Sequence, residues 1–166
     1  MTGTPPPAPR NSLPGDDPAD RSIIVKTGDE LTAGDVYAIW QIRDAVFAVE
    51  QQCDEPDVDG IDLLPTTTHL WCADAGGPTS YLRTYVTDDG VRRVGRVATR
   101  KDARGRGLSS RLLRDVHDRW GSEEIRIGAQ AYLEEWYGSF GYERCGDGYV
   151  EAGIPHVPMI RRGSLG

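Results

Sequence analysis

The part of the chain that most constrains its fold is a strand-like segment at 91–99 that leads, through a loop rich in glycine and arginine, into a helix-like segment at 108–120. The first segment is predicted as a strand from its β-branched side chains. The second has an apolar side chain at every fourth position, which predicts a helix with one continuous apolar stripe. This stripe comprises Leu108, Leu112, Val116 and Trp120. Because the stripe has to be buried, the helix must pack on the sheet that contains the strand.

The loop between these two segments has the properties of an anion-binding site. Residues 96–114 contain seven basic side chains and one acidic side chain, Asp102, in a chain whose formal net charge is −7. Glycine lets the backbone approach a ligand closely, and a helix start offers unpaired N–H groups and a favourable dipole. The loop lacks the glycine pattern of a nucleotide P-loop or a dinucleotide fingerprint. It therefore predicts another kind of phosphate-bearing ligand, and the alternative is a solvated basic face.

The composition indicates one soluble domain. The 166 residues are 38% hydrophobic, enough for one core, and no apolar run approaches the roughly 20 residues that span a bilayer. Residues 1–21 hold six of the eleven prolines and are predicted to be a disordered tail, so that the domain occupies 22–166. The three cysteines lack the spacing of a disulfide framework or a metal site. We expect a cytoplasmic protein with no signal peptide and no membrane association.

An antiparallel meander and one helix are predicted in the rest of the first two thirds of the chain. Thr32 is predicted to cap a helix that runs to about Glu50, with Asp35 at the capping-box position. The buried face of this helix is predicted to comprise Val36, Ile39, Trp40, Val46 and Phe47. The polar segment 51–68 is predicted to be a long, functional loop. Strands are expected at 23–25, 69–73, 80–87 and 91–99.

A parallel strand pair is predicted around the central helix. Alternating apolar residues at 125–129 predict a strand after that helix, and a strand, a helix and a second strand imply parallel pairing. Residues 132–142 predict a short helix that ends at Gly141, followed by one or two closing strands. His117, on the 108–120 helix, is predicted to be solvated.

Two motifs, in order along the chain, resemble motifs of the Gcn5-related N-acetyltransferase (GNAT) superfamily. Arg104-x-x-Gly107-x-Ser109 resembles its pyrophosphate-binding signature, and Trp136-Tyr137-x-x-Phe140-Gly141-Tyr142 resembles its aromatic segment. Shorter segments resemble the ElaA-like subgroup. They are Arg43-x-x-Val46-Phe47-x-x-Glu50-Gln51, Asp59-Gly60-x-Asp62, Thr68-His69-Leu70, Gly95-Arg96-Val97, Ala129-Gln130-Ala131 and Gly153-Ile154-Pro155-His156.

The resemblance implies an α+β fold with layers of helix, sheet and helix. The sheet would be mixed and mostly antiparallel, and its two central parallel strands, at 94–99 and 124–130, would splay apart to admit the pantetheine arm of acetyl-coenzyme A. The cofactor-binding residues that the resemblance implies are Val97, Ala98, Thr99, Arg104, Gly105, Arg106, Gly107, Leu108, Ser109, Ser110 and Gln130. Two of them depart from the family pattern, since Ser109 stands in place of Gly or Ala and Gln130 in place of Asn.

Acetyl transfer to an amine requires a base for the ammonium, donors to the carbonyl oxygen and an acid for the leaving thiolate. By resemblance the backbone of residues 97–99 polarises the thioester carbonyl. Tyr137 is the candidate acid, because a phenol with an ordinary pKa near 10 is protonated at neutral pH. The candidate bases are Glu50, His69 and His156, and the sequence leaves the choice between them open. A carboxylate lining from Asp57, Asp59 and Asp62 would suit a cationic acceptor, although such loops are usually solvated.

The sequence therefore predicts an N-acetyltransferase that uses acetyl-coenzyme A by direct attack of an amine in a ternary complex, without a metal or a covalent intermediate. The alternative is a non-catalytic acyl-coenzyme A sensor on the same fold. A nucleic-acid-binding module is disfavoured, because the chain is acidic overall and has no second basic stripe. The acceptor, a small molecule or a protein amine, and the choice between monomer and homodimer stay open.

Overall fold

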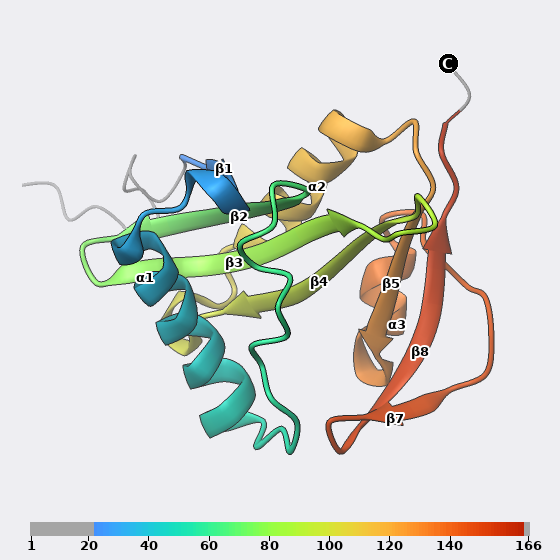
Figure 1. The fold of residues 1–166 in the computed structure, drawn as a ribbon. Helices are drawn as coiled ribbons and strands as arrows, with labels where there is room; N and C mark the ends of the chain where they lie inside the picture. Colours follow the sequence, from blue (N-terminus) through green and yellow to red (C-terminus); the bar gives the residue numbers. More distant parts are fainter. Residues whose placement is uncertain (1–21, 165–166) are drawn as a thin grey trace, which may run out of the picture.

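The computed structural model describes residues 22–164, so the tail predicted at 1–21 lies outside the described residues. Within that range eight strands form one sheet in the order β1-β2-β3-β4-β5-β8-β6, and β7 pairs with β8 (Figure 1). The β4–β5 pair is parallel and the other pairs are antiparallel, as predicted. The strands are β1 (Ile24–Thr27), β2 (Thr67–Asp74), β3 (Gly77–Val86), β4 (Arg92–Thr99), β5 (Ile125–Gln130), β6 (Glu143–Arg144), β7 (Tyr149–Glu151) and β8 (Ile154–Arg161).

The two central strands splay apart. β4 and β5 pair only at Arg92 with Ile125 and at Arg93 with Arg126, and then separate (Figure 1). A β-bulge lies where they part, because Tyr81 of β3 faces Ala98 whereas Arg83 faces Gly95. The bulge contains Arg96, whose φ of 53° is in the left-handed region that side-chain-bearing residues seldom adopt. From the bulge onward the β5-facing edge of β4 carries backbone groups without a strand partner, and the resemblance predicts this opening.

Helix α1 (Ala33–Arg43) begins where the sequence predicts. The Thr32 side chain accepts a hydrogen bond from the Asp35 amide at 3.1 Å, and the Asp35 carboxylate accepts one from the Thr32 amide at 2.9 Å. The helix continues as the π-helical segment η3 (Asp44–Glu50), which ends at the predicted position. The predicted buried face is wrong at Trp40, which is 45% exposed, because the interior position beside it is taken by Arg43.

Helices cover both faces of the sheet. Helix α2 (Leu108–Trp120) buries Leu112 and Val116 against one face, and Tyr137 of helix α3 (Glu134–Gly138) joins the same core. Helix α1 buries Ile39 and Ile42 against the opposite face. The predicted packing of the 108–120 helix is confirmed. Short 3-10 turns are η2 (Gly28–Glu30), η4 (Lys101–Ala103) and η5 (Ala131–Leu133).

One prediction about α2 is wrong. His117 is half-buried rather than solvated, and its Nε2 lies 2.9 Å from the hydroxyl of Tyr142. Burial first, and then the charge of Arg161, lower its pKa to about 4. Among the described residues, no helix has the length and apolar character needed to cross a membrane.

Candidate active site

A cavity of about 560 Å³ opens between the splayed end of β4, the start of α2 and the end of η3. Nine of the eleven predicted cofactor-binding residues line it, and so does Glu50. These nine are Val97, Ala98, Thr99, Arg104, Gly105, Gly107, Leu108, Ser109 and Ser110. Arg106 and Gln130 are not among its lining residues. The guanidinium of Arg106 donates instead to the carbonyl of Asp102 at 3.1 Å.

The glycine-rich loop has a geometry that suits an anionic ligand. Gly105 and Gly107 have φ values of 78° and 71°, and a Cβ added at either would meet no atom within 4 Å. They are therefore required by backbone conformation and leave open space beside the chain. Gly107 is the N-cap of α2 and no side chain caps this helix, so the first N–H groups of α2 have no partner within the helix. Such a start can bind pyrophosphate, and we conclude that the residues present fit the cofactor implied by the resemblance.

The Ser109 hydroxyl has partners within the protein. It lies 2.5 Å from Oγ1 of Thr99 and 3.2 Å from Oγ of Ser80, and these two hydroxyls are 3.0 Å apart. The three hydroxyls therefore form a hydrogen-bonded cluster that connects the start of α2 to β3 and β4. This explains how a serine is accommodated where the family pattern has glycine or alanine.

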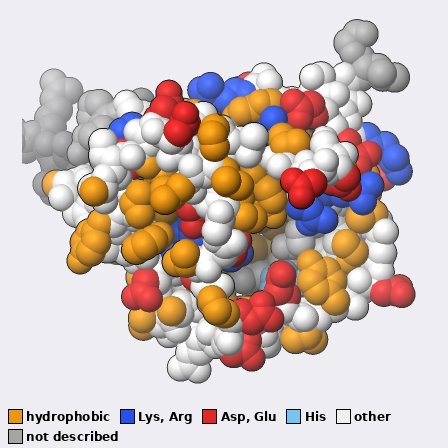
Figure 2. Space-filling view, in the orientation of Figure 1, with side chains coloured by type: hydrophobic (Ala, Val, Ile, Leu, Met, Phe, Trp, Pro, Cys, Tyr) orange, Lys and Arg blue, Asp and Glu red, His pale blue; other side chains and the backbone are white. Residues whose placement is uncertain are grey.

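A second cavity, of about 430 Å³, adjoins the first. Four residues line both cavities, namely Gln51, Val97, Tyr132 and Leu133. The second cavity is bounded by β4, β5, the 51–57 segment and the β7–β8 hairpin, and Figure 2 shows a hollow on this face of the molecule. The splayed strand pair thus connects a compartment beside the glycine-rich loop to a compartment beside the two predicted catalytic residues Tyr137 and His156.

Tyr137 lines the second cavity and is only 5% exposed. Its ring packs edge-to-face against Trp136 and Tyr142, at centroid distances of 4.8 and 5.8 Å. Burial raises the pKa of the phenol well above its ordinary value. The hydroxyl is therefore protonated at neutral pH and is available as a proton donor.

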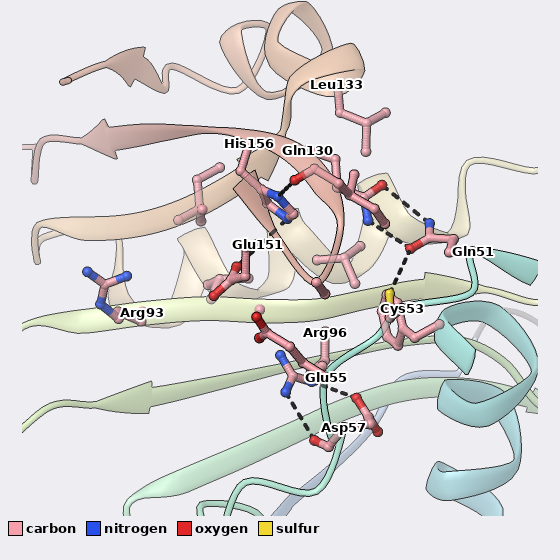
Figure 3. Close-up of a pocket in the computed structure, with 18 of the residues that line it drawn as sticks. Gln51, Cys53, Glu55, Asp57, Arg93, Arg96, Gln130, Leu133, Glu151 and His156 are labelled. Atoms are coloured by element: carbon pink, nitrogen blue, oxygen red, sulfur yellow. Dashed lines mark hydrogen bonds and ion pairs between the residues drawn. The ribbon is translucent and has the colours of Figure 1, made fainter. Parts of the chain in front are cut away.

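His156 lies on β8 and lines the same cavity. Its Nδ1 donates to the carbonyl of Ile154 at 2.7 Å, since a carbonyl can only accept, and this places the lone pair on Nε2. Nε2 lies 3.8 Å from Oε2 of Glu151, across the β7–β8 hairpin (Figure 3). Tyr149 stacks on the imidazole with centroids 5.6 Å apart and fixes the plane of the ring. The tautomer and the orientation are those of a base that faces the cavity.

The other two candidate bases have different surroundings. His69 is fully buried, and its ring nitrogens lie 2.7 Å from the Tyr81 hydroxyl and 2.8 Å from the Asp62 carbonyl, so it lines neither cavity. Burial lowers its pKa. Glu50 lies at the cofactor-side cavity with both carboxylate oxygens bound by Arg104 at 2.7 Å. Of the three candidates, His156 is the one that lines the same cavity as Tyr137.

The aspartates of the predicted cluster form ion pairs with arginines. Arg43, which is fully buried, donates to Asp57 at 2.7 Å and to Asp62 at 2.6 Å. Arg83 pairs with Asp59 and, at 2.8 Å, with Asp62. Of the three aspartates only Asp57 lines the second cavity. The cluster therefore anchors the 51–66 segment to α1 and β3.

A family model described as an acetyltransferase (GNAT) domain matches residues 58–162. The chain belongs to the GNAT family. A UPF0039 protein of Mycobacterium tuberculosis is 41% identical over 139 residues, which cover 81% of this chain and 89% of the relative. The crystal structure of Escherichia coli ElaA superposes with a TM-score of 0.77 at 32% identity, over 85% of this chain and 99% of ElaA. An acyl-CoA N-acyltransferase from Pseudomonas aeruginosa superposes with a TM-score of 0.77 at 35% identity, over 84% of this chain and 98% of that protein.

These findings place the chain in the ElaA-like subgroup of GNAT proteins and make it an acyltransferase of the class that uses acyl-coenzyme A. The predicted family and fold are thus confirmed.

Several contacts in this GNAT site have no signal in the sequence. Gln51 and Gln130 form a reciprocal amide pair, with N–O distances of 3.3 and 2.8 Å, between the end of η3 and the end of β5 (Figure 3). The pair lies where the two cavities adjoin. Glu151 reaches His156 only because the β7–β8 hairpin folds back, and no spacing rule predicts that contact. Gln51 and Gln130 each lie in a segment that resembles the ElaA-like subgroup, and Gln130 is an implied cofactor-binding residue, but neither segment predicts that the two side chains pair.

Proposed function

We propose that this protein is an acetyl-coenzyme A-dependent N-acetyltransferase that acetylates a primary amine by direct attack within a ternary complex. The observation that supports this best is the connection of the two cavities at Val97, with the glycine-rich loop on one side and Tyr137 and His156 on the other. A cytoplasmic location stays a prediction, which cell fractionation tests.

The cofactor, when bound, supplies an acyl group activated as a thioester. The N–H groups at the start of α2 and the guanidinium of Arg104 are the groups we assign to its pyrophosphate. The unpaired backbone of residues 97–99, beyond the bulge, is the candidate donor set for the carbonyl oxygen on which negative charge develops.

His156 is the proposed base. An amine acceptor is mostly an ammonium at neutral pH and has no lone pair until a proton is removed. Nε2 of His156 accepts that proton, while Nδ1 keeps its hydrogen bond to Ile154 and holds the ring in place. Glu151, 3.8 Å from Nε2, stabilises the imidazolium that results.

Tyr137 is the proposed acid. Its buried hydroxyl retains the proton at neutral pH and donates it toward the departing sulfur. We thus assign one proton acceptor and one proton donor to the same cavity, which is the division of roles that acyl transfer to an amine requires.

The test measures release of free coenzyme A thiol by the full chain with acetyl-coenzyme A and a panel of amines. We expect Tyr137→Phe and His156→Gln each to lower kcat by about 100-fold or more, with little change in cofactor affinity. Tyr37→Phe, at a side chain that is 66% exposed, is the matched control and should leave kcat unchanged. Cofactor binding without thiol release for any acceptor would instead favour a non-catalytic acyl-coenzyme A sensor.

A further inference from the structure

The second cavity has more carboxylates than its internal ion pairs require. Its charged lining comprises four acidic residues, Asp44, Glu55, Asp57 and Glu151, and two basic residues, Arg93 and Arg96. Figure 2 shows acidic side chains along the lower border of the hollow on this face. A surplus of negative charge in an acceptor compartment bears directly on which amine can enter it.

Two of these six charges neutralise each other. Arg96 pairs with Asp57 at 2.7 Å, and the same aspartate is also bound by the buried Arg43. Among the described residues, Asp44, Glu55 and Glu151 form no ion pair with a lysine or arginine, and Arg93 has no carboxylate partner. Three unpaired carboxylates against one unpaired guanidinium leave an excess of two negative charges.

A second, independent observation is that the free ring nitrogen of His156 faces this cavity. His156 is 8% exposed and its Nε2 accepts no hydrogen bond from any described residue, although Nδ1 is fully engaged. This nitrogen faces the cavity with its lone pair free, so it can accept a proton from a ligand that enters the cavity. Glu151 is the carboxylate beside this nitrogen, whereas Glu55 enters the cavity from the 51–57 segment on the other wall (Figure 3). The two carboxylates therefore come from two different segments of the chain.

Building on the acetyltransferase function proposed above, we propose that the acceptor is a small diamine or polyamine. One nitrogen reacts at His156 beside Glu151, and a second, still protonated nitrogen is bound by Glu55 with help from Asp44. A volume of about 430 Å³ is that of a small-molecule site. Glu55 is thus a specificity-determining residue that contacts the ammonium remote from the reaction.

The experiment compares three acceptors of equal chain length, namely 1,4-diaminobutane, 4-amino-1-butanol and 4-aminobutanoate, in the coenzyme A release assay. We expect kcat/KM for the diamine to exceed that for the amino alcohol by about tenfold or more, since a charge-assisted hydrogen bond contributes about that factor. The amino acid should be the poorest acceptor. Equal kcat/KM values for the diamine and the amino alcohol would overturn the proposal.

Glu55→Gln localises the effect. It should raise KM for the diamine by about tenfold, with kcat and the amino-alcohol KM nearly unchanged. Glu124→Gln is the matched control, because Glu124 pairs with Arg126 and does not line the cavity. If Glu55→Gln leaves the diamine preference intact, the proposed role of Glu55 is wrong.

Calorimetric titration of 1,4-diaminobutane into protein saturated with coenzyme A separates this inference from the proposed function. Binding that Glu55→Gln weakens, without acetylation of any amine, supports the diamine site and contradicts the transferase function. Acetylation of monoamines such as 4-amino-1-butanol, together with no measurable diamine binding, supports the transferase and overturns the diamine site.

Discussion

The guanidinium of Arg104 is held by both carboxylate oxygens of Glu50, with two N–O distances of 2.7 Å. The hydrogen bonds from Arg104 lower the pKa of Glu50 and keep it ionised at neutral pH. Arg104 occupies the first position of the pyrophosphate-binding signature. Both of its NH2 groups are engaged by Glu50, so they cannot bind a phosphate in the same way at the same time. If Arg104 binds the pyrophosphate as proposed, Glu50 competes with the cofactor for it. In this structure both carboxylate oxygens of Glu50 are engaged by Arg104, which disfavours Glu50 as a general base.

Glu50→Gln tests that competition. Removing a negative charge from an anion site should lower the dissociation constant of coenzyme A by about two- to fivefold, because exposed ion pairs are weak. Arg104→Ala should raise it by about tenfold, the loss of one charge-assisted contact. Fluorescence or calorimetric titration measures both. A fall of about 100-fold in kcat for Glu50→Gln would contradict this role and identify Glu50 as the base.

The order of strands and helices could be predicted from periodicity and turn residues, because burial of an apolar stripe or an alternating strand face leaves few arrangements. The burial of Arg43 could not be predicted in this way, and the predicted burial of Trp40 is wrong for that reason. Helical spacing places both residues on neighbouring positions, and whether a guanidinium enters the interior depends on Asp57 and Asp62, which arrive from a loop without periodicity.

The candidate site was predictable where a motif prescribes backbone geometry and unpredictable where two distant segments meet. The glycine-rich loop carries its own signal, since Gly105 and Gly107 require positive φ values. His69 and His156 are both single histidines in apolar strands, and only the sheet order decides that one is enclosed between Tyr81 and Asp62 while the other faces a cavity.

Ser109→Ala should separate stability from cofactor affinity. The Ser109 hydroxyl contacts Thr99 and Ser80, so its loss should lower the free energy of unfolding by about 1 kcal/mol. The dissociation constant of coenzyme A should change by less than about twofold, because the backbone N–H groups of α2 are unaffected. Urea denaturation and cofactor titration measure the two quantities. A tenfold loss of affinity with unchanged stability would show that the hydroxyl binds phosphate instead.

His117 should make the protein less stable in mild acid. Its pKa in the folded state is lowered to about 4, whereas an unfolded histidine has a pKa near 6.5, so the unfolded chain binds the proton first as the pH falls. The stabilisation is complete above pH 6.5 and is lost progressively toward pH 4, by about 2 kcal/mol at pH 4.5. Urea unfolding at pH 7 and 4.5 measures this loss. His117→Gln, which retains a polar group for Tyr142, should reduce the difference; an unchanged difference would exclude His117 as its source.

Arg43→Ala should be among the most destabilising single substitutions in the domain. Arg43 is fully buried, and its removal leaves Asp62, itself 8% exposed, with Arg83 as its one remaining cation, while the 51–66 segment loses its anchor on α1. Breaking a buried ion pair by removing one partner costs about 3–5 kcal/mol. Arg119→Ala is the matched control, since Arg119 pairs with Asp115 on the exposed side of α2, where such pairs contribute about 0.5 kcal/mol or less. Urea denaturation of both variants gives the comparison. Equal losses would mean that the Arg43 network is as weak as a surface pair, and that the 51–66 segment is held by its other contacts.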